Sequence, residues 1–342
     1  MAVRVGINGF GRIGRSFTRA LLARGGNAGV ELVAVNDPFG DADTMAFLLK
    51  HDSVGGVLPN EVKATAGGFS IDGKEIKKLE VREPAEIPWA GEGVDVVIES
   101  TGLFTARDKA AAHLTGGAKR VVISAPSGDA DISICMGIND TAFDPAAHTV
   151  ISNASCTTNC LAPLAKVLND SFGIDNGLIT TVHAYTSDQQ LQDMATASRS
   201  GKPDLRRMRA AALSIIPNTT GAARAIGLVL PELKGKLDGM ALRVPTPTGS
   251  ITDLVANVRA GVSADDVNNA FAAAAAHPSY RGVLEYSDEP LVSADIVGNP
   301  ASCIFSAKDT MVNGRTVKVL GWYDNEWGYS NRLVDLIAFI GG

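Results

Sequence analysis

The stretch GFGRIG, residues 9–14, follows the apolar run VRVGI and opens a stretch of helical composition, GRSFTRALLAR. It is a complete GxGxxG, which between a strand and a helix is typical of a dinucleotide-binding turn. The first glycine allows the tight turn, the second lets a pyrophosphate approach the backbone, and the third lets helix and strand pack closely. The helix N-terminus then offers free N–H groups and a positive dipole end to the phosphates.

A second apolar run, VELVAV, ends at Asn36 and Asp37. A ribose-binding acid is expected at the end of the second strand of such a unit, and the GGNAG loop at 25–29 explains why it comes late. Asp37 would repel a 2′-phosphate, so we predict NAD in preference to NADP. The alternative is that the glycines only turn the chain and that Asp37 caps a loop. We predict cofactor contacts at Gly9, Gly11, Gly14 and Asp37.

Short apolar runs continue the alternation of strand and helix after residue 90. The stretch ARDKAAAHL between two of them has helical composition, so the pattern is that of a parallel sheet with crossover helices. Asp72-Gly73, between alternating runs at 67–81, indicates a hairpin that is an antiparallel appendage to this sheet. The apolar runs are VDVVIES (94–100), KRVVISAP (119–126) and ISICMGI (132–138).

From about residue 150 the pattern changes to runs of strands with segregated helices, which indicates an α+β domain. A chain of 342 residues is also longer than one core usually supports. We predict an α/β protein whose first domain is a Rossmann-type doubly wound parallel sheet. The second, catalytic domain is α+β with a largely antiparallel or mixed sheet. The predicted bounds are 1–154 for the first domain, completed by a C-terminal helix at 325–342, and 155–324 for the second.

Within the second half, helical composition is found at 157–169 and 264–276. The final segment, GYSNRLVDLIAFI, has its apolar residues mostly on one helical face. Apolar or alternating runs at 178–186, 240–247, 250–258 and 316–323 indicate strands.

The charge balance argues against broad nucleic-acid binding, because 31 basic residues against 37 acidic ones give a net charge of −6. No apolar stretch is long enough for a signal peptide or a membrane span, so we expect a cytoplasmic protein with no membrane partner. Four cysteines in so long a chain do not make a disulfide framework.

Cys156 lies in NASCTTNCLAP (153–163), where an apolar run gives way to helical composition. A thiol at a helix N-terminus has its thiolate stabilised by the dipole and the free N–H groups, which predicts a pKa lowered toward neutrality. Cys160 is one helical turn further on and is most simply a buried neighbour. The CxxxC spacing does not fit redox CxxC chemistry.

His183 lies in an apolar run of strand character, LITTVHAYTSDQ. A lone strand histidine is usually a hydrogen-bonded core residue. With a candidate thiolate upstream, a Cys–His pair that activates a sulfur nucleophile becomes the favoured reading. A zinc site at Cys156, Cys160 and His183 would lack a fourth ligand and the usual CxxC-type spacing, so we predict no metal.

Several longer stretches together resemble one family, the phosphorylating glyceraldehyde-3-phosphate dehydrogenases. The resemblance runs from Val3 to Ile340 in consistent order. It implies that Cys156 is the nucleophile that adds to the aldehyde of glyceraldehyde 3-phosphate, and that His183 is the base. It also implies NAD as hydride acceptor, inorganic phosphate as second substrate, a place in glycolysis and a homotetramer. The matching stretches are NGFGRIGR, SNASCTTNCLAP, HAYTSDQ, SIIPNTTGAA, LRVPTPTGS and WYDNEWGYSNR.

The same resemblance assigns further contacts. Thr186 and Arg243 would hold the substrate phosphate, and Arg207 would be a further basic contact. The inorganic phosphate would contact Ser155, Thr157, Thr220 and Gly221. Turn capping is the alternative for any one of these hydroxyls. The cofactor contacts implied by the resemblance are Arg12, Ile13, Asp37, Arg82, Ser124 and Asn325.

One stretch departs from the family pattern. QQLQDMATASRSGKPDL, before Arg206, is about five residues longer than usual, with the extra residues around Ala195–Pro203. In relatives this loop lies at a subunit interface beside the cofactor. The insertion motivates the hypothesis of a specialised isoform that tolerates a covalent inhibitor of the active cysteine. Inactivation at the same rate as an ordinary homologue would contradict it.

Two other activities are compatible with parts of the pattern. A sibling dehydrogenase acting on erythrose 4-phosphate would use similar motifs. A Cys–His thioesterase or hydrolase would explain the thiol and the imidazole, but it leaves the dinucleotide turn without a purpose. A catalytically idle binding protein would not need the full set of Cys156, His183, Thr186 and Arg243.

Overall fold

The computed structural model describes residues 2–195 and 204–341. By contact density the chain divides into two compact units. The first comprises Met1–Ile134, Thr141–Ala154 and Ser330–Gly342, and the second comprises Cys135–Asp140 and Ser155–Tyr329. Residues Cys135–Asp140, predicted within the first domain, therefore group with the second unit.

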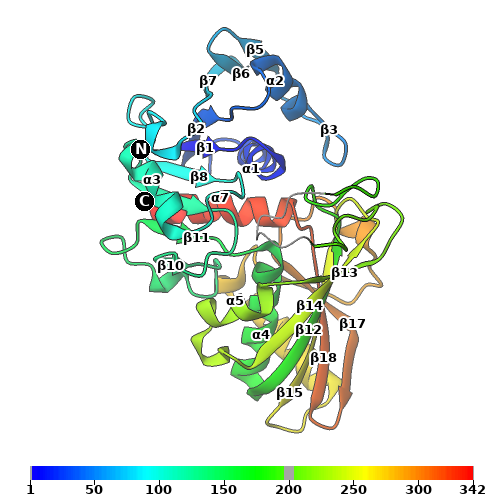
Figure 1. Cartoon of the computed structure of the whole chain (residues 1–342). Helices are drawn as coiled ribbons and strands as arrows, with labels where there is room; N and C mark the ends of the chain where they lie inside the picture. Colours follow the sequence, from blue (N-terminus) through cyan, green and yellow to red (C-terminus); the bar gives the residue numbers. More distant parts are fainter. Residues whose placement is uncertain (1, 196–203, 342) are drawn as a thin grey trace. The chain divides into compact units, whose positions relative to one another are not determined.

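In the first unit, nine of the described strands form one sheet, in the order β10-β11-β9-β8-β1-β2-β7-β6-β5 (Figure 1). The strands from β10 to β7 are parallel, and β6 and β5 continue the sheet antiparallel. The strand bounds are β1 (Val3–Asn8), β2 (Val30–Asn36), β5 (Val62–Thr65), β6 (Gly68–Ile71), β7 (Lys74–Leu79), β8 (Val96–Glu99), β9 (Arg120–Ile123), β10 (Ile132–Ser133) and β11 (Val150–Ser152). The helices are α1 (Arg12–Ala23), α2 (Ala42–Lys50) and α3 (Arg107–Thr115), with β3 (His51–Asp52) and β4 (Gly56–Val57) as a small separate pair.

The strand order places a topological switch next to β1. The chain leaves β1 for β2 on one side, and β8 pairs with β1 on the other. In open parallel sheets a ligand crevice forms at the carboxyl ends of the strands at such a point. Asn8, Asn36 and Glu99 end these three strands.

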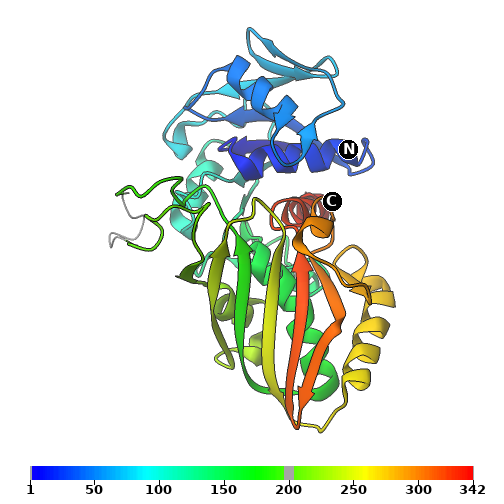
Figure 2. The ribbon, with the colours of Figure 1, turned by 90° about the vertical axis from the view of Figure 1, so that its right-hand side faces the viewer.

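In the second unit, seven of the strands that the structure describes form a mixed sheet in the order β13-β14-β12-β15-β18-β17-β16. Two pairs are parallel, β12 with β14 and β16 with β17, and the others are antiparallel. Helix α4 packs on several of these strands and contacts both α5 and α6, so the three helices share one face of the sheet (Figure 2). The bounds are α4 (Cys156–Phe172), β12 (Ile174–Ala184), β13 (Ile216–Thr219), α5 (Ala222–Val229), β14 (Leu237–Val244), β15 (Ser250–Val258), α6 (Ala264–Ala276), β16 (Leu284–Ser287), β17 (Cys303–Asn313) and β18 (Thr316–Tyr323). Helix α7 (Trp327–Gly341) belongs to the first unit from Ser330 onward.

The predicted α/β class, with a parallel sheet in one half and a mixed sheet in the other, is confirmed. The hairpin at Asp72-Gly73 is formed by β6 and β7, but β7 also pairs parallel with β2 and so belongs to the main sheet. The prediction of a strand at 132–138 is largely wrong, since β10 covers only Ile132–Ser133. Helix α2 and strand β17 were not predicted.

Candidate active site

Cys156 is the first residue of α4, directly after a turn that leaves the last strand of the first unit. Ser155 is the N-cap, and its Oγ accepts a hydrogen bond of 3.0 Å from the backbone N–H of Thr158. Such a side-chain cap satisfies one of the free N–H groups that begin a helix. The helix continues unbroken through Pro163 to Phe172. The cap therefore fixes Cys156 at a helix N-terminus, as the sequence predicted.

His183 lies at the end of β12, where it faces Cys156. Its Nε2 is 3.3 Å from Cys156 Sγ. On the neighbouring strand β14, Arg243 is the parallel-sheet partner of His183. The sheet register thus brings an imidazole and a guanidinium together beside the thiol. Cys156 and His183, which the sequence predicted as a pair, form one cluster with Arg243.

Hydrogen bonds at the other ring nitrogen determine which tautomer His183 adopts. Nδ1 is 2.7 Å from the backbone oxygen of Ala184, which can only accept, so Nδ1–H donates to it. Arg243 Nη1 also lies 2.8 Å from Nδ1. Its two hydrogens have acceptors in Ala184 O at 2.9 Å and Thr186 Oγ1 at 3.1 Å. The lone pair of His183 is therefore on Nε2, where it can accept a proton from the thiol.

Burial determines the charges of the pair. It raises the pKa of the Cys156 thiol to about 11, although the Arg243 charge and hydrogen bonds from Thr157 act to lower it. Burial, together with Arg243, lowers the pKa of His183 to about 3. The prediction that the helix N-terminus lowers the thiol pKa toward neutrality is therefore wrong for the resting site, because desolvation outweighs the stabilising groups. Both shifts favour a neutral, hydrogen-bonded pair in the resting site, in which the thiol faces Nε2.

A polar chain extends from Arg243 away from the thiol. Thr186 Oγ1 donates to one carboxylate oxygen of Asp188, and Arg207 pairs with the other oxygen. Asp188 is half-buried; desolvation acts to raise its pKa, but the hydrogen bond from Thr186 and the charges of Arg207 and Arg243 outweigh it and lower the pKa. Sequence reasoning missed Asp188, although it lies in the HAYTSDQ run. Two arginines and a hydroxyl gathered in this way are typical of a phosphate-binding site.

Tyr323 is a second residue that sequence reasoning missed. It is 1% exposed, and its hydroxyl lies 2.9 Å from Thr157 Oγ1 and 2.8 Å from Thr181 Oγ1. Its ring meets that of His183 edge to face, with ring centroids 5.9 Å apart. Tyr323 thus packs against one side of the imidazole, and its hydroxyl forms a buried hydrogen bond with that of Thr157.

The remaining predicted contacts of the second unit lie at a helix start and in a polar loop. Thr220 Oγ1 accepts a hydrogen bond of 3.2 Å from the backbone N–H of Ala222, and Gly221 is the N-cap of α5, which packs on α4. Asn325 is 5% exposed, and its Oδ1 accepts from Ser250 Oγ at 2.9 Å. Ser250 Oγ in turn accepts from the N–H of Ala184, beside His183.

The first unit contains a pocket of about 290 Å³ at the carboxyl ends of β1, β2 and β8, where the switch in strand order predicts a ligand crevice. The predicted contacts Gly9, Gly11, Asp37 and Arg82 line it, whereas Arg12, Ile13, Gly14 and Ser124 do not. The pocket is lined by Asn8, Gly9, Gly11, Asn36, Asp37, Pro38, Phe39, Val81, Arg82, Ser100, Thr101, Leu103 and Phe104.

The three glycines differ in what surrounds them. Gly9 has φ +91°, and a Cβ there would also lie 2.8 Å from the backbone nitrogen of Thr101. A Cβ on Gly14 would lie 2.7 Å from Gly9 O, so this glycine lets helix and turn approach closely. A Cβ on Gly11 would meet no protein atom within 4 Å. Space is therefore left open beside Gly11, where a dinucleotide phosphate approaches in a turn of this kind.

Asp37 braces the glycine turn from the end of β2. Its carboxylate accepts from the backbone N–H of Phe10 at 2.8 Å and from that of Phe39 at 2.9 Å. In the pocket lining, the Arg82 guanidinium lies 5.5 Å from the centroid of the exposed Phe39 ring. A carboxylate, an aromatic face and a cation around a glycine turn fit an adenine nucleotide with a free ribose.

Arg12, Ile13 and Ser124, also predicted as cofactor contacts, do not line the pocket. Arg12 and Ile13 are in the first turn of α1, and the Arg12 side chain pairs with Asp52. Ser124 follows β9, and its Oγ donates to the backbone oxygen of Glu99 at 3.0 Å. Contact between these residues and a cofactor remains a prediction.

Three of the four cysteines are buried. All four cysteines are free thiols, and Cys160 is buried with its Sγ 3.4 Å from the backbone oxygen of Gly321. In residues 2–195 and 204–341, no group of three or more His, Cys, Asp or Glu side chains is arranged to hold a metal. Within the same ranges no helix has the length and apolar character needed to cross a membrane.

Family models match both halves of the chain. Residues 3–107 match the family model described as the NAD binding domain of glyceraldehyde 3-phosphate dehydrogenase, and residues 155–325 match the model of its C-terminal domain. The chain belongs to the glyceraldehyde-3-phosphate dehydrogenase family. The second model begins at Ser155, the N-cap of the helix that carries Cys156.

Members of this dehydrogenase family resemble the chain over its whole length. It is 59% identical over 342 residues to glyceraldehyde-3-phosphate dehydrogenase of Streptomyces coelicolor, and 58% identical over 341 residues to glyceraldehyde-3-phosphate dehydrogenase 2 of Streptomyces arenae. It is also 58% identical over 345 residues to the Mycobacterium avium enzyme. Each alignment covers 100% of this chain and 99% of the relative.

Proposed function

We propose that the protein is an NAD-dependent, phosphorylating glyceraldehyde-3-phosphate dehydrogenase. It converts glyceraldehyde 3-phosphate, NAD and inorganic phosphate to 1,3-bisphosphoglycerate and NADH. The observation that carries the proposal is the 3.3 Å contact between Cys156 Sγ and the unprotonated Nε2 of His183. A nucleophile and a base within hydrogen-bond reach are what covalent capture of an aldehyde needs.

The first half of the reaction follows from this geometry. As Sγ forms a bond to the aldehyde carbon, the thiol proton passes to His183 Nε2 and then to the new alkoxide, which gives a thiohemiacetal. His183 next takes the hydroxyl proton while the hydride leaves the same carbon, and a thioester remains on Cys156. Bound NAD supplies the hydride acceptor for this step.

The second half releases the product. A phosphate oxygen attacks the thioester carbonyl, the C–S bond breaks, and Sγ leaves as thiolate. The protonated His183 returns its proton to Sγ or releases it to solvent. A thioester suits this step because it keeps the acyl group reactive instead of releasing it as a carboxylate.

Two phosphate groups need separate anion sites near the thiol. Arg243 and Thr186 are joined by a 3.1 Å hydrogen bond and lie beside His183, which suits the phosphate of the aldehyde substrate. Arg207 is anchored by Asp188 at the far end of this chain. For the inorganic phosphate we propose Ser155, Thr157, Thr220 and Gly221, at the starts of α4 and α5.

In the first unit, the glycine turn and Asp37 would hold the dinucleotide. Gly9, Gly11 and Gly14 shape the turn, with Arg12, Ile13, Arg82 and Ser124 around it, and Asn325 of the second unit would fix the nicotinamide amide. The Asp37 carboxylate favours a free 2′-hydroxyl over a 2′-phosphate, so NAD is the preferred cofactor.

We further propose a cytoplasmic homotetramer that serves glycolysis. The inserted stretch Ala195–Pro203, the basis of the hypothesis of an inhibitor-tolerant isoform, lies outside the described residues except for Ala195. That hypothesis stays a prediction, to be tested by inactivation kinetics against a homologue without the insertion.

An initial-rate assay tests the proposed activity. Glyceraldehyde 3-phosphate is supplied with NAD or NADP, with and without phosphate, and erythrose 4-phosphate serves as the comparison aldehyde. We expect phosphate-dependent NADH formation, with higher kcat/KM for NAD and for glyceraldehyde 3-phosphate. Thioester hydrolysis without any NAD reduction would contradict the proposal.

A further inference from the structure

A buried polar network lies beneath the nucleotide pocket of the first unit and takes no part in the chemistry proposed above. Its centre is Glu99, the last residue of β8, which is 2% exposed. His113 on α3 and Trp89 before β8 complete the network on the side away from the pocket, and both are 0% exposed. Asn8 and Thr101 complete it on the pocket side, where both line the cavity.

The donors around Glu99 occupy both of its oxygens. Oε2 accepts from Asn8 Nδ2 at 2.6 Å and from His113 Nε2 at 3.0 Å. Oε1 accepts from the backbone N–H of Thr101 at 2.8 Å, and the Thr101 hydroxyl donates to the same oxygen. A buried carboxylate with four donors has one geometry that satisfies them all, so its position is fixed.

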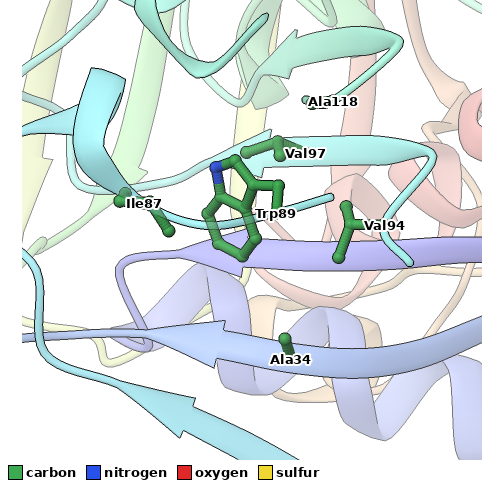
Figure 3. Close-up of a cluster of buried hydrophobic side chains, with 6 residues drawn as sticks. All are labelled: Ala34, Ile87, Trp89, Val94, Val97 and Ala118. Carbon is green, nitrogen blue, oxygen red and sulfur yellow. The ribbon is translucent and has the colours of Figure 1, made fainter. Parts of the chain in front are cut away.

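Trp89 determines the proton position on His113. The indole Nε1 is a donor only, and it lies 3.1 Å from His113 Nδ1. Nδ1 must therefore accept, and the ring proton is on Nε2, where it donates to Glu99. The indole is itself immobilised in a cluster of buried apolar side chains that includes Ile87, Val94 and Val97 (Figure 3). A Cβ on Gly6 of β1 would lie 2.6 Å from the Trp89 ring, so the ring packs directly on the strand.

From Glu99 the network reaches the walls of the pocket by two routes. Asn8 Oδ1 accepts from Asn36 Nδ2 at 2.7 Å, and Asn36 holds the backbone of Val81 through two hydrogen bonds of 2.9 Å. Along the other route, Thr101 packs on the side of Gly9 that a Cβ would fill. Five lining residues of the pocket are thus positioned by one carboxylate: Asn8, Gly9, Asn36, Val81 and Thr101.

We propose that His113, oriented by Trp89 and acting through Glu99, is a positioning residue of the nucleotide pocket. The proposal rests on the proposed function in so far as the pocket is taken to bind NAD. Apolar packing would stabilise this part of the fold without burying a carboxylate, which is costly unless every oxygen is satisfied. What the network adds is a fixed placement of the Asn8 and Thr101 side chains.

The test compares NAD affinity with stability in matched variants. His113→Phe keeps a ring but removes both the donor to Glu99 and the acceptor for Trp89. We expect the dissociation constant for NAD, from equilibrium titration, to rise about tenfold. Removing one partner from a buried hydrogen-bond network has a free-energy cost of at least this size, and displacement of Asn8 and Thr101 would pass it on to the pocket. His113→Gln keeps an N–H for Glu99 and should stay within about threefold of the unmodified protein. In turnover, His113→Phe should raise KM for NAD and leave kcat unchanged.

Val121→Ala is the matched control. Val121 is 0% exposed and packs with Ala110 of α3, the helix that carries His113, but it does not line the pocket. We expect it to lower Tm and leave the NAD dissociation constant unchanged. If Val121→Ala weakened NAD binding as much as His113→Phe does, His113 would have only a structural role, and the proposal would be overturned. So would unchanged NAD binding in a folded His113→Phe protein.

Two further measurements cover the case in which His113→Phe does not fold. Trp89→Phe removes only the indole part of the network and should also weaken NAD binding. In the unmodified protein, 15N NMR of the five histidines should show one buried ring protonated at Nε2. A proton on Nδ1 of His113 would contradict the network. Failure of the unmodified protein to bind NAD would instead reject the proposed function.

Discussion

Two histidines of this chain are almost completely buried, and they differ in what their ring nitrogens meet. His113, in the first unit, has both nitrogens engaged, with an indole donor on one side and a carboxylate on the other. His183, in the second unit, has Nδ1 tied to a backbone oxygen while Nε2 faces a thiol. A fully satisfied imidazole holds its neighbours in place. An imidazole with a lone pair facing a nucleophile can carry out proton transfer.

The same contrast extends to the surroundings of each residue. The Glu99 carboxylate beside His113 accepts hydrogen bonds from four donors, which stabilise it in the interior of the first unit. In the second unit, burial raises the pKa of Cys156 and lowers that of His183, so neither group is charged at rest. In the proposed mechanism, Cys156 and His183 become charged only when the thiol proton moves to Nε2 during attack on the aldehyde. Substitutions in the two regions should therefore have separable effects on binding and on chemistry.

The largest expected effect is that of Cys156→Ser. A serine hydroxyl is a far weaker nucleophile than a thiol, so we expect kcat to fall by about 10³-fold or more. The NAD dissociation constant should stay that of the unmodified protein, because the pocket belongs to the first unit. Initial rates and an NAD titration measure the two quantities. Substantial turnover in the variant would remove Cys156 from its role.

His183→Asn should have the next largest effect. It removes the base at Nε2, and general base catalysis contributes about 10²- to 10⁴-fold to a rate. We expect kcat to fall within this range with no change in NAD affinity, the reverse of the pattern for His113→Phe. If both variants lost NAD affinity and kept kcat, the distinction between the two histidines would be wrong.

The stability of the protein should depend on pH through His183. Its pKa in the folded protein is lowered to about 3, whereas an unfolded histidine titrates near 6.5. As pH falls below about 6.5 the unfolded chain binds a proton that the folded site does not, and stability is lost at about 1.4 kcal/mol per pH unit. Denaturant unfolding at pH 7 and pH 5 should show this loss in the unmodified protein. The His183→Asn variant, tested alongside it, should lack this contribution, and equal slopes would refute the lowered pKa.

The smallest expected effects come from two glycines of the first unit. Gly14→Ala places a Cβ 2.7 Å from Gly9 O, and such overpacking costs about 1–3 kcal/mol of stability. Gly11→Ala meets no protein atom within 4 Å, so stability should change by less than about 0.5 kcal/mol. NAD binding by Gly11→Ala should nevertheless weaken, because the methyl group enters the open space beside the turn. Urea unfolding and NAD titration of both variants measure this difference. Unaltered NAD binding by Gly11→Ala would show that the phosphates do not approach there.

Local patterns in the sequence predicted much of this account. The glycine turn, the acid after the second strand, and the thiol at a helix start are all encoded within short stretches, as is the change from parallel to mixed sheet. The position of His183 in a strand was also predictable. Its distance from Cys156 was not, because it depends on how β12 and α4 pack.

The features that the sequence did not predict depend on residues far apart in the chain. The direction of the Cys156 pKa shift follows from burial in a site that Arg243 and Tyr323 help to build. The Glu99 network joins Asn8 and His113, which lie 91 and 14 positions from Glu99. The strand predicted at 132–138 ends at Ser133, and Cys135–Asp140 belong to the second unit.

The central claim, a covalent thioester on Cys156, is tested most directly by a rapid-mixing experiment without phosphate. Enzyme is mixed with glyceraldehyde 3-phosphate and NAD, and NADH is followed by absorbance. We predict a burst approaching one NADH per chain that then stops, steady turnover only after phosphate is added, and no burst in Cys156→Ser. Steady turnover without phosphate, or a burst in the Cys156→Ser variant, would contradict the account.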